Sequence, residues 1–451
     1  MRILREEKGQ VLVMTAFCMA CLLGALGMAV DVGVLFNARR QMQTAADAAA
    51  LAGATEVFYN GTASANINSK VYAAAKANGV DQAVSGNTVL VTVGPTLSPG
   101  SVSCPTCVKV QLSKPNPTFF MQAMSSFFFA NSSFSNINVS AMGVAGAPGY
   151  SHTCMYVMDP TGNDTLDIHG AGKINASGCD IYVNSDSKSA LCVTGSAGKS
   201  VLTPGGQIVV HGQQDSGGNC KGDPGPPTTF NSGVQSSPYA KTLPTDPTSN
   251  CNPGNTVDLA ASGGTLTGTI AGPGYGNYVC YKDSAITKGK MTPVTLSGAT
   301  LKAGNYIFET GVTITGATTI GEGNGSISNP ATNTNGGATV IVTGGTYDSG
   351  TATTFSDYAP ADPNNIYNGL AIYQVASDSN AMNLQFGSGS SIFDGAVYAP
   401  SAQVTLHDQG GAVNATQLIV GSIYLNGTVN LQNYSALNPT TSPFRVITLV
   451  Q

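Results

Sequence analysis

Hydrophobic positions first form one long uncharged run, VLVMTAFCMACLLGALGMAV, over residues 11–30. At about 1.5 Å per helical residue, such a run crosses the roughly 30 Å hydrocarbon layer of a bilayer. A cleaved signal peptide is the alternative, but its apolar core usually has about 7–15 residues, and no small-x-small cleavage site follows this run. The pattern therefore predicts a cytoplasmic tail over residues 1–9 and a single transmembrane helix over residues 10–36.

Small residues recur at four-residue spacing in this run, at Ala25, Ala29 and Gly33. Because a helix has about 3.6 residues per turn, the three positions share one face. Small side chains let a second helix approach closely within a membrane. We therefore expect these three residues to form a packing face for another membrane helix.

An alanine-rich stretch, RRQMQTAADAAALAGA, follows over residues 39–54. Alanine has the highest helix propensity and no proline interrupts this part of the chain, so one helix is predicted to leave the bilayer and continue as far as Phe58. Ala46, Ala49 and Gly53 share a face and are expected to approach a partner closely. A solvated alanine linker is the alternative, because alanine-rich helices can be stable without partners.

Residues 37–147 mix helical and strand patterns. NSKVYAAAKANGV predicts a short helix that ends at Gly79, and NTVLVTV and CVKVQLS alternate as strands. PTFFMQAMSSFFF predicts an apolar helix after Pro117, and INVSAMGVAG predicts a further strand. We therefore expect a small α/β module here.

From residue 151 onward, the pattern changes to short apolar alternations bounded by Gly, Asn, Asp or Ser, such as QIVVHG, NYIFETG and TVIVTGG. Short strands with turns between them predict an all-β domain over residues 151–451. Their similar lengths and terminal glycines favour a β-solenoid of stacked rungs, with a β-sandwich as the alternative. Residues 215–254 are dense in Pro, Gly and Asn and are predicted to form a long excursion from the strands or a linker.

Ten cysteines divide into two groups, with Cys18 and Cys21 in the hydrophobic run and eight beyond it. An even number in a chain poor in charge is typical of an oxidising compartment, so the part after the run is expected outside the cytoplasm. We predict that the cysteines beyond the run form disulfides: Cys104, Cys107, Cys154, Cys179, Cys192, Cys220, Cys251 and Cys280.

The CPTC motif at Cys104 and Cys107 has two interpretations. A thioredoxin-like redox pair needs a helix after its first cysteine, whereas the following VKVQLS has strand periodicity, so a disulfide that clips a turn is favoured. A zinc site would need two further ligands. The other six cysteines allow fifteen pairings.

Two of those pairings are the most natural in the sequence. Cys154 with Cys179 is expected to join two strands. Cys220 with Cys251 is expected to restrain the Pro-rich excursion, where closing a loop removes chain entropy from the unfolded state.

Charge excludes one class of partner. Charged residues are 10% of the chain, against about 25% in ordinary domains, and the formal net charge is −5. After Lys302 the one cation is Arg445, whereas eight carboxylates occur there. Nucleic-acid binding needs clustered Lys and Arg, so we expect no nucleic-acid partner.

Candidate catalytic residues are densest at Asp164, Asp167 and His169. A lyase acting on an acidic sugar would need a base and several cations, and only Lys173 and Lys199 are near in sequence. Aspartates that cap turns and a surface histidine are the favoured interpretation. We assign no catalytic residue, cofactor-binding residue or metal ligand, and expect that the protein is not an enzyme.

The N-terminal motifs also have a recognisable order. Gly9–Gln10 opens the hydrophobic run and Asp31–Gly33 closes it. Arg39, Arg40 and Gln43 follow. The alanine run of residues 45–52 then contains Ala46, Asp47 and Ala49, and Gly53 comes directly after it. This order resembles the N-terminal region of TadE/TadG-like (Flp, or tight-adherence) pilus-assembly proteins.

The resemblance implies a membrane-anchored structural component of Flp/Tad-type pilus assembly or of the cell envelope, which acts by protein–protein or surface contact. It implies a single-pass protein of the bacterial inner membrane, and we expect the C-terminal domain to be periplasmic or surface-exposed. The expected partners are the membrane, other pilus-assembly or envelope proteins, and surface glycans. An anchored adhesin and an envelope carbohydrate-active β-helix enzyme are the alternatives.

Overall fold

The chain folds into two compact units in a computed structural model. The first unit comprises Met1–Pro148 and Val446–Gln451, and the second comprises Gly149–Arg445. The structure describes residues 8–97, 102–104, 106–123, 135–146, 153–177, 179–194, 206–225, 228–234, 237–239, 242–274, 276–287, 290–322, 336–361, 365–386, 392–408, 414–433, 444 and 447–449.

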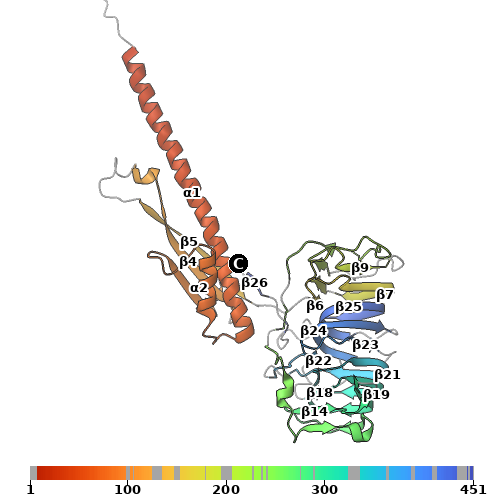
Figure 1. Cartoon of the computed structure of the whole chain (residues 1–451). Coiled ribbons are helices and arrows are strands. Elements are labelled where there is room, and N and C mark those ends of the chain that lie inside the picture. Colours follow the sequence, from red (N-terminus) through yellow and green to blue (C-terminus); the bar gives the residue numbers. More distant parts are fainter. Residues whose placement is uncertain are drawn as a thin grey trace, which may run out of the picture. The chain divides into compact units, whose positions relative to one another are not determined.

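One helix, α1 (Lys8–Asn60), runs for 53 residues through the first unit (Figure 1). It is long and apolar enough to cross a membrane. Its first half exposes most of its side chains, whereas its alanine-rich second half is buried against the rest of the unit. The predicted continuation of the hydrophobic run into the alanine stretch is therefore confirmed, and the helix ends two residues after Phe58.

An antiparallel sheet packs against the second half of α1 (Figure 1). In spatial order its strands are β1 (Thr88–Val93), β4 (Val108–Pro117), β5 (Asn136–Gly146) and β26 (Thr448–Leu449). Strands β2 (Thr96–Leu97) and β3 (Val102–Ser103) form a separate short hairpin. The three longer strands match the predicted ones, whereas β26 is a C-terminal strand that we did not predict.

A second helix, α2 (Ile67–Ala77), buries Ile67, Val71 and Ala75. The chain then turns at Gly79, whose φ of +88° lies in the left-handed region that glycine adopts without strain. Most of the helix predicted after Pro117 falls outside the described residues; its described part is one helical turn at 120–123.

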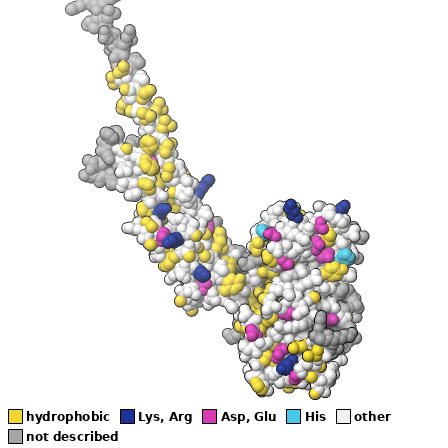
Figure 2. All heavy atoms as spheres, in the orientation of Figure 1, with side chains coloured by type: hydrophobic (Ala, Val, Ile, Leu, Met, Phe, Trp, Pro, Cys, Tyr) yellow, Lys and Arg dark blue, Asp and Glu magenta, His cyan; other side chains and the backbone are white. Residues whose placement is uncertain are grey.

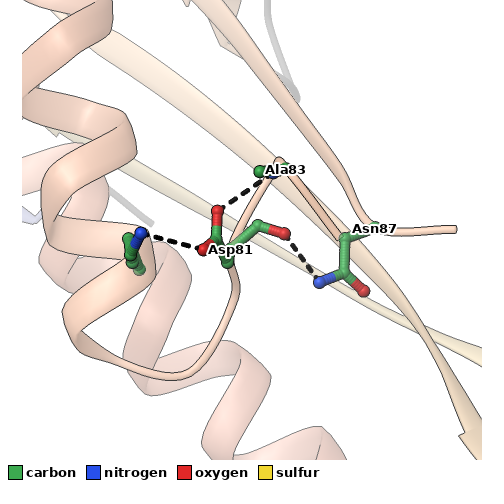
Figure 3. A network of polar contacts seen from close by, with 4 residues as sticks. Asp81, Ala83 and Asn87 are labelled. Carbon is green, nitrogen blue, oxygen red and sulfur yellow. Dashed lines mark hydrogen bonds and ion pairs between the residues drawn. The ribbon is translucent and has the colours of Figure 1, made fainter. Parts of the chain in front are cut away.

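Asp81 fixes the connection from α2 to β1 (Figure 3). One carboxylate oxygen accepts the Ala83 N–H at 3.0 Å, and the other lies 3.0 Å from the Lys76 ammonium. The Asn87 amide donates to the Asp81 carbonyl oxygen at 2.8 Å. The Ala83 N–H first, and then Lys76, hold the pKa of Asp81 below its usual value.

The second unit is strand-rich and is organised around an 18-stranded sheet in which the neighbours pair in parallel. What we call the first ladder contains β12 (Thr256–Asp258), β14 (Tyr278–Lys282), β18 (Gly304–Phe308), β20 (Ala338–Val342), β22 (Leu370–Gln374), β24 (Ile392–Asp408), β25 (Asn414–Gln432), β6 (Thr153–Val157), β8 (Asp180–Val183), β10 (Ile208–Val210) and β11 (Thr228–Thr229).

A second ladder runs beside the first and shares its two longest strands. It contains β13 (Thr265–Ile270), β17 (Val294–Leu301), β19 (Val312–Ile320), β21 (Tyr347–Tyr358), β23 (Met382–Phe386), β24, β25, β7 (Leu166–Ser177) and β9 (Leu191–Val193). Short additions are the β15 (Ile286–Thr287) and β16 (Lys290–Met291) hairpin and two 3-10 helices, Pro247–Asn250 and Ala260–Ser262.

The register of the strands in the first ladder places similar side chains above one another. A fully buried apolar column consists of Tyr306, Val340, Ile372, Val397, Leu418, Met155, Ile181 and Ile208. The neighbouring positions form a second column on the other side of the sheet: Ile307, Ile341, Tyr373, Tyr398, Ile419, Tyr156 and Tyr182. Adjacent residues of a strand point to opposite faces, so the ladder buries both of its faces.

Spatial order differs from chain order at one place. Strand β25 pairs with β24 on one side and with β6 and β7 on the other. The first strands of the unit therefore lie next to its last long strand, and β12 and β13 begin the ladders at the opposite end (Figure 1). The chain reaches that far end through residues 215–254, the predicted excursion, of which residues 228–229 form β11 and still pair with β10.

The excursion packs on the second column, at its tyrosines Tyr373 and Tyr398. The Tyr239 hydroxyl donates to the carbonyl oxygens of Ile366 and Asn368 at 2.6 and 3.1 Å. The Tyr373 hydroxyl donates to the Pro244 carbonyl oxygen at 2.7 Å. The Tyr239 ring also lies 6.0 Å from the Tyr398 ring, so this segment packs on the strands instead of forming a free linker.

Candidate assembly surface on helix α1

The alanine-rich half of α1 packs closely on the sheet. Ala45, Ala46 and Ala49 are fully buried. A Cβ added at Gly143 of β5 would lie 2.6 Å from the Ala46 carbonyl oxygen, so strand and helix backbones nearly touch there. Large side chains at these positions would hold the strand away from the helix.

Gly53 lies at the crowded end of this face. A Cβ added there would lie 2.8 Å from methyl groups of both Val71 on α2 and Val108 on β4. Ala48, by contrast, points to a partly exposed side of the helix. We call Ala46, Ala49 and Gly53 the alanine face; it contacts the rest of the first unit.

The polar residues of the motif lie at the edge of this contact. The Gln43 amide donates to Asp47 at 2.8 Å and to the Met142 carbonyl oxygen of β5 at 2.9 Å. Gln43 therefore connects helix to strand, while Arg39 and Arg40 are exposed. Arg39 borders a groove of about 430 Å³ between α1 and β5 that is lined by Val32, Leu35, Phe36, Ile137, Asn138, Val139 and Ser140.

The small residues in the first half of α1 have a different environment. Ala25, Ala29 and Gly33 are exposed, and we call them the small-residue face. A Cβ added at Gly33 would meet no atom of the structure within 4 Å. Figure 2 shows hydrophobic side chains along this half of the helix. Leu22, Leu23 and Leu26 of this half are more than 60% exposed.

Asp31 is a functional candidate whose contacts sequence reasoning missed. Only 1% of the residue is exposed, although it follows an apolar run. Its two carboxylate oxygens accept the backbone N–H groups of Phe119 and Met121 at 3.0 and 2.7 Å. An acid that closes an uncharged run signals a buried partner, but the partners are 88 and 90 residues away in sequence.

All eight cysteines beyond the run form disulfides, while Cys18 and Cys21 are free. The predicted pairs Cys104–Cys107 and Cys154–Cys179 are observed.

The predicted pairing of Cys220 with Cys251 is wrong. Cys220 pairs with Cys192 of β9, and Cys251 pairs with Cys280 of β14. The excursion runs between opposite ends of the ladders, so each of its own ends is fastened to the strand nearest to it.

In the acid cluster of the second unit, Asp164 and Asp167 each have one buried carboxylate oxygen without a hydrogen-bond partner among the described residues. Burial raises the pKa of Asp164 and of Asp167 above the usual value. Asp164 lies close to the sulfur atoms of Cys192 and Cys220, but a cysteine ligand must be a thiolate, and these two are disulfide-bonded. The His169 ring packs near Tyr424, at 5.6 Å between ring centres.

The observed features define a class of proteins in which a long apolar helix packs on a small sheet in one unit and a strand-rich unit follows. Residues 9–56, which lie within α1, match the family model described as "Putative Flp pilus-assembly TadE/G-like". The N-terminal region is therefore TadE/TadG-like, as its motifs predicted, and the match supports a part in Flp/Tad pilus assembly. No curated protein and no solved structure matches the chain significantly.

Proposed function

We propose that this protein is a single-pass structural component of Flp/Tad pilus assembly that acts by contact and not by catalysis. In this proposal α1 anchors it in the bacterial inner membrane, and both units lie outside the cytoplasm. The eight disulfide-bonded cysteines support that orientation, because disulfides persist in oxidising compartments.

One observation carries the proposal: α1 has two faces of small residues, and one of them has no protein partner in the described structure. The alanine face is buried within the first unit. The small-residue face has the same kind of spacing but is exposed. Lipid chains give little reason to keep side chains small, whereas a neighbouring helix does. The small-residue face is therefore the site where another membrane helix of the assembly packs.

The second unit, in our proposal, is a β-solenoid that presents a surface to pilus subunits or glycans. Parallel pairing between alternate strands, as in β18–β20–β22 and β17–β19–β21, supports this architecture. Columns of like residues along the ladders support it further, because each rung of a solenoid stacks on the next.

Substitution of Ala29 by Leu tests the membrane contact. Overpacking a close contact costs about 1–3 kcal/mol, so association with a partner helix is expected to weaken by roughly 5-fold to 150-fold. Ala16→Leu is the matched control, because Ala16 is an exposed alanine of the same run. At about 100° per residue, it lies on the opposite side of the helix.

Pilus-dependent surface attachment and co-purification of pilus-assembly proteins would be measured for both variants, with membrane abundance as the folding control. We expect Ala29→Leu to lose both at normal abundance and Ala16→Leu to keep them. Equal behaviour of the two variants would contradict assembly through this face.

The two alternative functions predict different results in a glycan screen with the full chain in detergent. Glycan binding without turnover, together with normal assembly in Ala29→Leu, would favour an anchored adhesin. Turnover of a glycan would favour a carbohydrate-active enzyme and would contradict a purely structural role.

A further inference from the structure

The segment that follows β4 contacts α1 within the predicted membrane span. A Cβ added at Gly27 would lie 2.5 Å from Cδ1 of Phe120, so the Phe120 ring packs directly on the helix backbone. Gly27 is three residues before the end of the uncharged run at Val30. At about 1.5 Å per residue, the contact lies roughly 4–5 Å inside that end.

Asp31 holds the segment at this depth. An ionised carboxylate is costly to bury unless it is hydrogen-bonded, and that cost is greatest near hydrocarbon. The N–H groups of Phe119 and Met121 supply the hydrogen bonds, one to each carboxylate oxygen. Release of the segment would leave the carboxylate without these donors, so the contact is fixed by more than apolar packing.

The rings next to these contacts are open to the surroundings. The exposed fractions of Phe119 and Phe120 are 64% and 45%, and Val30 of α1 is 53% exposed. The chain has no Asp, Glu, Lys or Arg between Lys114 and Asp159. An exposed apolar surface of this kind, without charges, matches acyl chains far better than water.

We propose that residues 118–123 are a second membrane-contacting element, in which Phe119 and Phe120 enter the lipid beside α1. The occupant of this surface is the bilayer because the two rings continue the apolar surface of the helix at the same depth. Gly27 and Asp31 lie on the side of α1 opposite to the small-residue face, since the helix turns about 100° per residue. The element therefore leaves that face open for a partner helix.

This inference rests on the proposed anchoring of α1, and one experiment separates the two. The chain has no Trp, so each single substitution introduces a unique fluorophore. Phe120→Trp reports on the proposed element and Leu26→Trp reports on α1. Val84→Trp is the control outside the membrane, because Val84 is an apolar residue of the first unit that is 55% exposed.

The full chain carrying each tryptophan would be reconstituted in vesicles of phosphatidylethanolamine and phosphatidylglycerol with brominated acyl chains. We expect Phe120→Trp to lose emission to the brominated lipid as Leu26→Trp does, and Val84→Trp to be quenched only by aqueous iodide. Quenching of Phe120→Trp by iodide alone, with Leu26→Trp quenched by lipid, would overturn this inference and leave the anchoring intact. Failure of Leu26→Trp to respond to lipid would overturn both.

Two further variants keep the result interpretable. Phe119→Trp repeats the measurement at the more exposed ring, where a larger side chain is accommodated. Asp31→Ala combined with Phe120→Trp is expected to reduce quenching by lipid, whereas Asp31→Ala combined with Leu26→Trp should leave it unchanged. Unchanged quenching in both combinations would show that Asp31 does not set the depth of the segment.

Discussion

The cores of the two units contain side chains of different size. In the first unit, the small residues Ala46, Gly53 and Gly143 let the helix and strand backbones approach closely. In the second unit, the core consists of large side chains, because the parallel ladders stack Tyr, Phe and branched aliphatic residues in columns. The first is therefore sensitive to added volume and the second to lost volume.

Phe308→Ala should produce the largest effect. Phe308 is fully buried, and its ring stacks on Tyr281 at 5.7 Å between centres. Truncation of a buried Phe costs about 3–5 kcal/mol. Chemical denaturation followed by limited proteolysis, which distinguishes fragments of the two units, should show the second unit unfolding early and the first unit unchanged.

Phe230→Ala is the matched control, because Phe230 is only partly buried against the same core. A loss as large as that of Phe308→Ala would mean that burial in the columns is not what stabilises the unit.

The second effect is a pH dependence whose sign for Asp394 and Asp357 of the second unit is opposite to that for Asp81 of the first unit. Burial raises the pKa of Asp394 from 3.8 to about 7, and burial with the charge of Asp394 raises that of Asp357 well above its usual value. The folded second unit thus holds protons that the unfolded chain releases near pH 4. Its free energy of unfolding should fall as pH rises from about 4 to about 7 and level off above that, by up to roughly 4 kcal/mol for Asp394 at about 1.4 kcal/mol per pKa unit.

Asp394→Asn should flatten this dependence between pH 4 and 8, measured by denaturation at each pH. Asp81 of the first unit has a lowered pKa, so its smaller contribution is present above its usual pKa and is lost as the solution becomes more acidic. An equally steep fall in Asp394→Asn would show that this carboxyl is not the source.

Gly53→Leu tests whether the first unit is destabilised by added side-chain volume. The methyl groups of Val71 and Val108 already occupy the space of its Cβ, so overpacking should cost about 1–3 kcal/mol or more. Ala48→Leu, on a partly exposed side of the same helix, should be tolerated. Protease resistance and membrane abundance would be compared, and equal behaviour would mean that the alanine face is only a spacer.

The helix was predictable from sequence because its signals are local. The uncharged run, the alanines without proline and the four-residue spacing all act within one element, and α1 extends through them to Asn60. The alternating strands of the first unit were predictable for the same reason. The positions of Ala46, Ala49 and Gly53 also indicated where the helix approaches its neighbours closely, since a close approach leaves no room for larger side chains.

Features that join distant parts of the chain were not predictable. The partners of Asp31 are about ninety residues away, and no local pattern marks the backbone N–H of Phe119. Strand β26 is two residues long and pairs with β5, which is some three hundred residues earlier. The wrong pairing of Cys220 with Cys251 has the same origin, because the sequence does not show that the excursion spans the ladders.

The placement of β25 has a consequence for biogenesis. Strands β6 and β7 are made early, yet their neighbour in the sheet is formed by residues 414–432. During synthesis these strands keep one open edge until residues 414–432 are made, and open edges of sheets are prone to aggregation. A chain interrupted before residue 414 would leave that edge unsealed and would also lack β26 of the first unit. We therefore expect a copy that stops before residue 414 to be degraded more readily than the full chain, because its sheet edge stays open.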